Sequence, residues 1–226
     1  MAALHYIGIG SFGCGDITIK NEEMMLQVDH ISKAFGARQV LSDVTFDVAA
    51  GEVVGLLGAN GAGKTTLLRI ITRLLEPDSG QVLFNGQPLT QDDLRNIGYL
   101  PEERGLYRRM RVGEQALYFT RLKGMSGSDA KVALHNWFQR LEMDEWWNRP
   151  AGKLSKGMQQ RLQFVITVAH TPRLLILDEP FSGLDTAGAD MLGREVLRLK
   201  EQGTAILLST HNLQAANELC DKTIRL

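Results

Sequence analysis

Residues 58–65 have the composition and spacing of a loop that binds phosphate. They form the sequence GANGAGKT, which fits the pattern G-x-x-x-x-G-K-[ST] and directly follows the apolar run Val53–Leu57. Glycines let successive backbone N–H groups point into one concavity, and a helix beginning after the loop adds its positive end. We therefore predict a phosphate cradle that comprises Gly58, Asn60, Gly61, Ala62, Gly63, Lys64, Thr65 and Thr66.

Two adjacent carboxylates follow another apolar run. Residues 173–180 form the sequence RLLILDEP, which places Asp178 and Glu179 at the end of a predicted strand. Asp178 can organise magnesium and its waters, and Glu179 can polarise an attacking water. In the loop, Lys64 is expected to reach the β- and γ-phosphates and Thr65 to hold magnesium. The alternatives are a glycine-rich turn without a ligand, and acids that only cap a helix or face solvent.

The elements that position these residues alternate between strand and helix. Residues 26–31 and 44–48 alternate apolar and polar side chains, which is typical of half-buried strands. Residues 53–57, 174–177 and 204–208 are continuous apolar runs, which is typical of parallel strands covered on both faces, and we expect the first two to be central. Helical patterns lie between the strands, and this order predicts an α/β fold.

A predicted helix follows the phosphate loop at residues 65–75, and another spans residues 158–169. Between residues 105 and 152 the sequence changes to a helical insert, with helices predicted at 112–123 and 128–141. All three tryptophans lie in this insert, and the last two are adjacent in sequence, so both cannot point the same way. One exposed indole would be an interface anchor. The alternative is that all three pack the small subdomain.

Composition excludes several classes of protein. The chain has 226 residues, 44% of them hydrophobic, which is enough to bury a full core. Lys and Arg number 25 against 26 Asp and Glu, so no global positive field exists to attract nucleic acid, and no nucleic-acid partner is expected. Cys14 and Cys220 belong to no Cys/His cluster, which favours a reducing compartment. No apolar stretch is long enough to cross a bilayer.

Three further motifs lie in a fixed order around the carboxylates. Residues 154–160 form LSKGMQQ, residues 182–185 form SGLD, and residues 209–211 form STH. With the phosphate loop and the Asp-Glu strand, this order resembles the ATP-binding cassette (ABC) family over about residues 26–226. The resemblance implies a P-loop NTPase with a RecA-like core, an antiparallel β subdomain and a small helical subdomain, which uses ATP and Mg²⁺. It also implies the ATP-binding subunit of a transporter.

The resemblance implies roles for five more residues. Ser155 and Gly157 would contact the γ-phosphate of ATP held by an opposite copy, Asp185 would line the same interface, and His211 would hydrogen-bond the γ-phosphate and the attacking water. These roles demand a homodimer or a second cassette. Phe35 stands where the family places an aromatic ring that stacks on adenine, although a core phenylalanine at a strand end is the alternative.

The sequence departs from the commonest family pattern at two places. Lys156 and Met158 stand where the signature usually has Gly and Gln, a form also seen in the family, so we expect retained activity. Glu102 stands where the glutamine loop presents Gln; a carboxylate ligates magnesium better but repels the γ-phosphate without it. Glu102 joins Thr65 and Asp178 as a predicted metal ligand. Residues 101–107 resemble subunits of multidrug- or sodium-exporting type.

The partner implied by the resemblance is an integral membrane permease subunit. In the family, the loop after the glutamine position and the helical subdomain form a groove that grips a short helix of that subunit. Here this loop carries four arginines, Arg104, Arg108, Arg109 and Arg111. The chain would then be cytoplasmic and peripheral on the inner face of the cell membrane. A soluble regulatory ATPase and a nucleotide-binding module without turnover are the alternatives.

The sequence also leads to a prediction for each end of the chain. Residues 1–25 are expected to be a leader of unknown role, followed by the ABC ATPase domain at 26–226. A final strand is expected to begin near Thr223, where family members generally continue beyond it.

Overall fold

A computed structural model describes residues 23–103 and 105–226, so most of the predicted leader, Cys14 and Arg104 lie outside the described residues. One sheet is antiparallel, in the order β2 (Arg38–Ala49), β1 (Met24–Phe35), β4 (Ser79–Phe84), β5 (Gln87–Pro88). The other is parallel, in the order β6 (Ile97–Leu100), β7 (Leu174–Asp178), β8 (Ala205–Thr210), β3 (Val53–Leu57), β9 (Lys222–Arg225).

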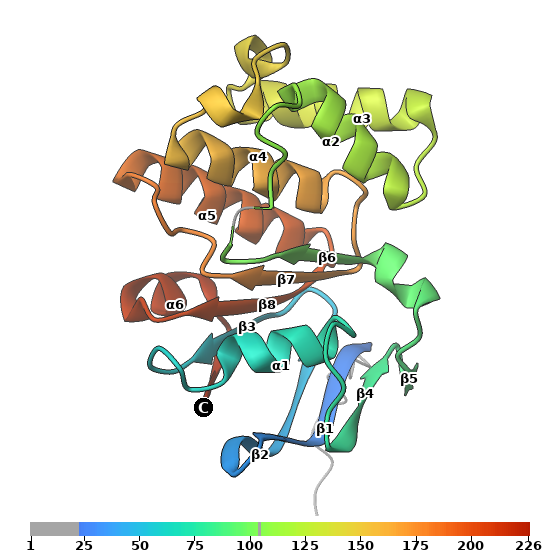
Figure 1. Cartoon of the computed structure of the whole chain (residues 1–226), viewed down its shortest axis with the longest axis vertical. Coiled ribbons are helices and arrows are strands. Elements are labelled where there is room, and N and C mark those ends of the chain that lie inside the picture. The colour runs from blue at the N-terminus through green and yellow to red at the C-terminus, as the bar shows by residue number, and fades with distance from the viewer. Residues whose placement is uncertain (1–22, 104) are drawn as a thin grey trace, which may run out of the picture.

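The helices cover both faces of the parallel sheet. They are α1 (Lys64–Ile71), α2 (Val112–Leu122), α3 (Gly127–Arg140), α4 (Lys156–Val168), α5 (Thr186–Glu201) and α6 (Leu213–Leu219). Short 3₁₀ turns form η1 (Asp92–Asn96), η2 (Asp144–Trp146) and η3 (Ala151–Lys153). Figure 1 shows α4 and α5 above the sheet, α2 and α3 beyond them, and α1 between the two sheets. The predicted α/β class is confirmed.

The parallel strands are apolar throughout because alternate side chains enter two separate cores. Leu175 and Leu177 of β7 pack with the helices α2 to α5, whereas Leu174 and Ile176 pack with α1 and the antiparallel sheet. Every residue of β3, β7 and β8 is buried. The predicted central position of β3 and β7 is confirmed, and β8 lies between them.

Most predicted elements differ from the observed ones only at their ends. The strands predicted at 26–31 and 44–48 are the interiors of the longer β1 and β2. The helix predicted at 65–75 ends earlier, at Ile71, because the Thr72 hydroxyl donates to the Leu68 carbonyl and Arg73 adopts a positive φ of 56°. The final strand near Thr223 is β9, which pairs with β3.

Of the two alternatives for the tryptophans, the structure supports packing: all three lie in or against the core of the helical part, and none is exposed. Trp146 is only 9% exposed and lies under the Arg161 guanidinium, and Trp147 packs edge-on against Phe138. Trp146 is the last residue of η2 and Trp147 follows it directly, and Gly113 leaves room for the Trp147 ring. A Cβ at Gly113 would lie 2.2 Å from the Trp147 ring. The tryptophans therefore build the helical part of the molecule and are not a surface anchor.

Candidate active site

The phosphate loop joins the end of β3 to the start of α1. Gly63 precedes the helix with a φ of 102°, and a Cβ there would lie 2.8 Å from the Leu41 side chain and 3.0 Å from the Val40 carbonyl oxygen. Only glycine fits this position, because the left-handed conformation and the close neighbours both oppose a side chain. Without a preceding side-chain cap, the first N–H groups of α1 stay free to bind an anion.

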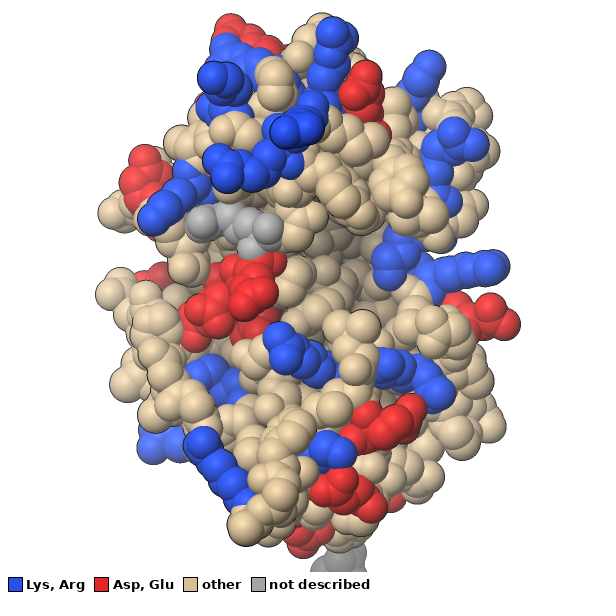
Figure 2. Space-filling view, in the orientation of Figure 1, with Lys and Arg blue, Asp and Glu red and all other residues tan. Residues whose placement is uncertain are grey.

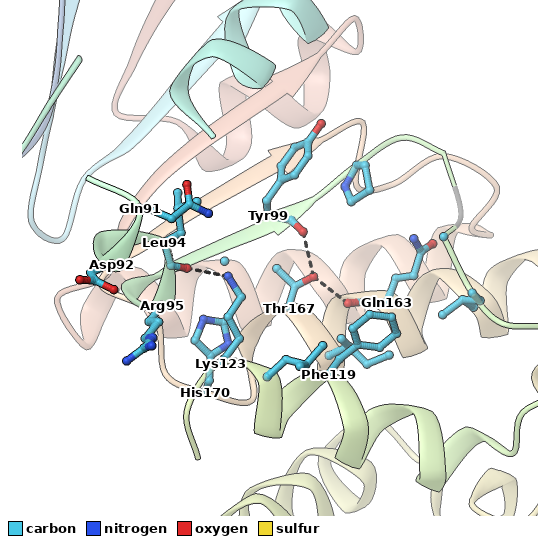
Figure 3. Close-up of a pocket in the computed structure, with 16 residues that line it drawn as sticks. Gln91, Asp92, Leu94, Arg95, Tyr99, Phe119, Lys123, Gln163, Thr167 and His170 are labelled. Atoms are coloured by element: carbon cyan, nitrogen blue, oxygen red, sulfur yellow. Dashed lines mark hydrogen bonds between the residues drawn. The ribbon is translucent and has the colours of Figure 1, made fainter. Parts of the chain in front are cut away.

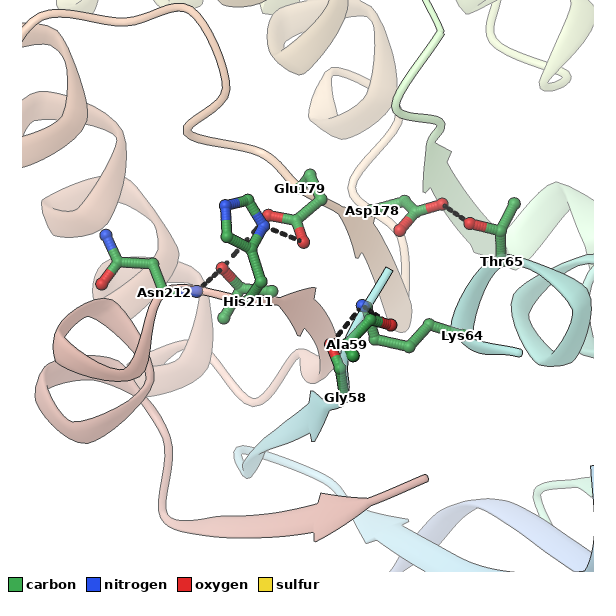
Figure 4. A network of polar contacts seen from close by, with 9 residues as sticks. Gly58, Ala59, Lys64, Thr65, Asp178, Glu179, His211 and Asn212 are labelled. Carbon is green, nitrogen blue, oxygen red and sulfur yellow. Dashed lines mark hydrogen bonds and ion pairs between the residues drawn. The ribbon is translucent and has the colours of Figure 1, made fainter. Parts of the chain in front are cut away.

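Lys64 lies folded back over the loop. Its ammonium donates to the Gly58 carbonyl at 2.6 Å and to the Ala59 carbonyl at 3.3 Å, and the side chain is 7% exposed (Figure 4). These carbonyls hold the charge at the entrance of the cradle. A phosphate oxygen placed in the cradle would be a stronger acceptor for the same ammonium, because charge-assisted hydrogen bonds are stronger than those to neutral carbonyls.

A hydrogen bond between Thr65 and Asp178 connects α1 to β7. The Thr65 hydroxyl donates to Asp178 Oδ2 at 3.0 Å. Asp178 ends β7 and is almost fully buried, and this burial raises the pKa of its carboxyl, against the lowering effect of the Thr65 hydroxyl. A cation at this position would stabilise the ionised carboxylate. The hydroxyl and the carboxylate are both oxygen ligands of the kind that Mg²⁺ accepts.

Glu179 is held by the last residue of β8 and by the residue that follows it. Its Oε1 accepts from His211 Nδ1 at 2.8 Å and its Oε2 accepts from the Thr210 hydroxyl at 3.2 Å (Figure 4). An ionised carboxylate only accepts, so His211 Nδ1 carries the proton in this pair. Glu179 itself has a φ of 49°, a left-handed conformation that costs about 1 kcal/mol or more for a side chain this long.

A cavity of about 380 Å³ brings most of the predicted residues together. It is lined by Phe35, Asn60, Gly61, Gly63, Lys64, Thr65, Thr66, Glu102, Asp178 and Glu179, and also by Arg38 and Val40. Phe35 is 51% exposed, so it is not the core phenylalanine of the alternative. Arg38 and Val40 were missed by sequence reasoning; their position just after the turn that follows Phe35 was the available signal.

Six predicted residues do not line this cavity, namely Gly58, Ala62, Ser155, Gly157, Asp185 and His211. Gly58 and Ala62 belong to the phosphate loop itself, where the Gly58 carbonyl accepts from Lys64. Ser155 caps α4 by accepting from the Met158 N–H, and Asp185 caps α5 by accepting from the Gly188 N–H. Gly157, in the first turn of α4, faces the backbone of Gly183. His211 reaches the site only through Glu179. Thr210, which sequence reasoning passed over, stands directly before His211 in the STH motif.

The residues present fit a nucleoside triphosphate with a divalent cation. The cradle offers N–H donors, one ammonium and enough volume for a phosphate chain, and the paired oxygens of Thr65 and Asp178 lie beside it. No group of three metal-ligating side chains occurs among the described residues, so Glu102 lines the cavity without joining a preformed cluster. Such a site suits Mg²⁺, which typically takes one or two protein oxygens plus phosphates and waters.

Comparison of the sequence with known proteins assigns the chain to one family. The family model described as ABC transporter matches residues 41–182. The uncharacterized ABC transporter ATP-binding protein YhaQ of Bacillus subtilis is 44% identical over 197 residues, covering 87% of this chain and 66% of YhaQ. The chain therefore spans just under two thirds of the length of that relative.

Two solved structures resemble the chain. A structure titled as the ATP binding subunit of an ABC transporter has a TM-score of 0.82 at 34% identity, covering 89% of this chain and 85% of that one. The dimeric structure of MJ0796, a bacterial ABC transporter cassette, has a TM-score of 0.81 at 24% identity, covering 89% and 94%, and shows the shared fold. The chain belongs to the ABC transporter family.

Proposed function

We propose that this chain binds ATP with Mg²⁺ and hydrolyses it to drive transport through a separate membrane subunit. The observation that carries the proposal is the position of the Glu179 carboxylate. His211 and Thr210 fix it in the cavity that the phosphate loop also lines. A carboxylate fixed in this way can take a proton from water as the water attacks the γ-phosphorus. In-line phosphoryl transfer needs mainly positioning and charge neutralisation.

Four other residues of the cavity have defined parts in this proposal. Lys64 moves its hydrogen bonds from the Gly58 and Ala59 carbonyls to the β- and γ-phosphates. Thr65 and Asp178 hold the magnesium ion, which supplies charge neutralisation at the phosphates when bound. Phe35 stacks on the adenine with its exposed ring face.

A second copy of the cassette completes the site in this proposal. Ser155, Gly157 and Asp185 do not line the phosphate cavity of their own chain. They cap or begin helices, so their hydroxyl, backbone and carboxylate groups can serve a facing nucleotide. The N-terminal end of α4 adds positive potential toward that γ-phosphate.

The partner and the location follow from the same proposal. The cassette binds an integral membrane permease subunit on the cytoplasmic side of the cell membrane, as a homodimer or with a second cassette. No helix of the described residues is long and apolar enough to span a membrane. We propose export as the direction, because residues 101–107 resemble those of exporting subunits.

The assay is phosphate release by the purified chain, with and without membrane partner. Glu179→Gln is expected to lower turnover by roughly a hundredfold to ten-thousandfold, because a general base contributes that much. The same variant should keep ATP binding and form an ATP-dependent dimer. Lys64→Ala should lose ATP binding. Unchanged turnover in Glu179→Gln would remove the base assignment, and wild-type ATP affinity in Lys64→Ala would remove the cradle.

A further inference from the structure

The aromatic wall of the phosphate cavity is a single ring at the end of a strand. Phe35 is the last residue of β1, lines the cavity and is 51% exposed. No other aromatic ring contacts it among the described residues. A ring with so little aromatic packing is free to change rotamer unless another group covers the side that faces away from the cavity.

Lys33 supplies this cover. Its ammonium lies over the Phe35 ring, 5.8 Å from the ring centroid, which is within the range of a cation–π contact. The Lys33 side chain is only 14% exposed, although the ammonium of a lysine usually extends into water. Lys33 does not line the phosphate cavity. It therefore leaves the cavity side of the ring open to a ligand.

Asp78 holds Lys33 in this position. Its Oδ1 accepts from the Lys33 ammonium at 2.7 Å, and its Oδ2 accepts from the Ala34 N–H at 2.7 Å. The Asp78 N–H donates to the Ser32 carbonyl at 2.9 Å. The Lys33 ammonium, and then the Ala34 N–H, hold the pKa of the Asp78 carboxyl below its ordinary value. Because Asp78 lies between α1 and β4, these bonds tie the end of β1 to the chain that leaves α1.

Other lysines of the chain are held differently. Lys123 lines a second cavity, of about 610 Å³, where its ammonium donates to the carbonyls of Leu94 at 2.6 Å and Ile97 at 2.7 Å (Figure 3). Among the described lysines, only Lys33 lies over an aromatic ring. Figure 2 shows basic and acidic side chains interspersed over the lower half of the molecule, which holds the antiparallel sheet. Mixed charges screen one another, so the influence of Lys33 is confined to its neighbours.

We propose that Lys33, held by Asp78, is a positioning residue for the adenine of ATP: it fixes the Phe35 ring in one orientation and leaves the opposite face to the base. The inference rests on the proposed function, in which Phe35 stacks on adenine. A ring that is fixed before binding loses less conformational entropy when the base stacks on it. The ammonium also draws electron density toward its own face of the ring, which makes the opposite face a better partner for an electron-rich base.

The test is calorimetric titration of the purified chain with ATP and magnesium. Lys33→Met keeps an unbranched side chain without the charge, and it should weaken ATP binding by about two- to fivefold, the size of a partly exposed cation–π contact. Lys33→Arg should bind nearly as the wild type does, because a guanidinium also pairs with a carboxylate and stacks on a ring. Lys200→Met is the matched control: Lys200 forms an ion pair with Asp221 and does not line the cavity, so its loss should leave ATP affinity unchanged. Urea unfolding checks that the variants are folded.

A double-mutant cycle shows whether the lysine acts through the ring. In a Phe35→Ala chain, Lys33→Met should cost no further ATP affinity, because no ring is left to position. Asp78→Asn keeps an oxygen for the Ala34 N–H but loses the charge that holds Lys33. It should weaken ATP binding in the same direction, and likewise only while Phe35 is present.

Two results would overturn the inference while the proposed function stands. One is a loss of ATP affinity from Lys33→Met that is equal with and without the Phe35 ring, which would mean that the lysine acts on the phosphates or on the fold as a whole. The other is an affinity of Lys33→Met equal to that of Lys200→Met. If the wild type binds no ATP, the inference and the proposed function both fail.

Discussion

The pH dependence of folding should reveal the buried, neutral state of His170. The imidazole has a pKa of about 4 in the folded chain against 6.5 for an ordinary histidine, chiefly because it is buried and secondly because Lys123 lies beside it. Between these two values the unfolded chain binds a proton that the folded chain does not. Stability contributed by the neutral ring is therefore complete above pH 6.5 and is lost as the pH falls toward 4.

The size of this effect follows from the same two values. At pH 5 nearly all unfolded chains carry the proton on His170 and few folded chains do, so the free energy of unfolding is lower by about 2 kcal/mol than at pH 7.5. Groups elsewhere in the molecule add their own pH dependence. A comparison with a variant that lacks only this imidazole removes those contributions.

Urea unfolding of His170→Gln and of the wild type at several pH values between 5 and 7.5 measures the difference. The wild type should lose about 2 kcal/mol more than His170→Gln over this range. His135→Gln is the matched control, because His135 is exposed on α3, and it should follow the wild type. If His170→Gln loses as much stability as the wild type over this range, the fold does not hold the imidazole neutral.

Three further predictions concern packing and the site. Gly113→Ala should lower the free energy of unfolding by about 1–3 kcal/mol, because a Cβ there would lie 2.2 Å from the Trp147 ring. Gly127→Ala, which has open space around it, should not destabilise the chain. Equal urea midpoints for the two variants would contradict this prediction. Phe35→Ala should weaken ATP binding by about tenfold in calorimetry and Phe35→Trp should largely restore it, because stacking needs only an aromatic face. Thr65→Val should raise the magnesium concentration needed for half-maximal turnover, and an unchanged magnesium dependence would exclude the hydroxyl as a ligand.

The local sequence determined the elements and the phosphate loop. Continuous apolar runs at β3 and β7 identified them as buried parallel strands, because only strands covered on both faces avoid polar residues. The glycine pattern of residues 58–65 identified the cradle, because such backbone turns admit few other residues. Helix ends were less predictable: α1 ends at Ile71 because the Thr72 side chain competes for a backbone carbonyl, a contact that periodicity does not reveal.

Only the tertiary structure decided which residues meet. Glu179 and His211 are far apart in the chain, and the hydrogen bond between them exists because β7 and β8 are neighbours in the sheet. Likewise Lys123 and His170 showed no pattern as separate residues; the packing of α2 against α4 and η1 buries them together. The sequence specifies local backbone geometry through short-range sterics and apolar spacing. Burial and charge pairing depend on long-range packing, and they appear only when the elements have assembled.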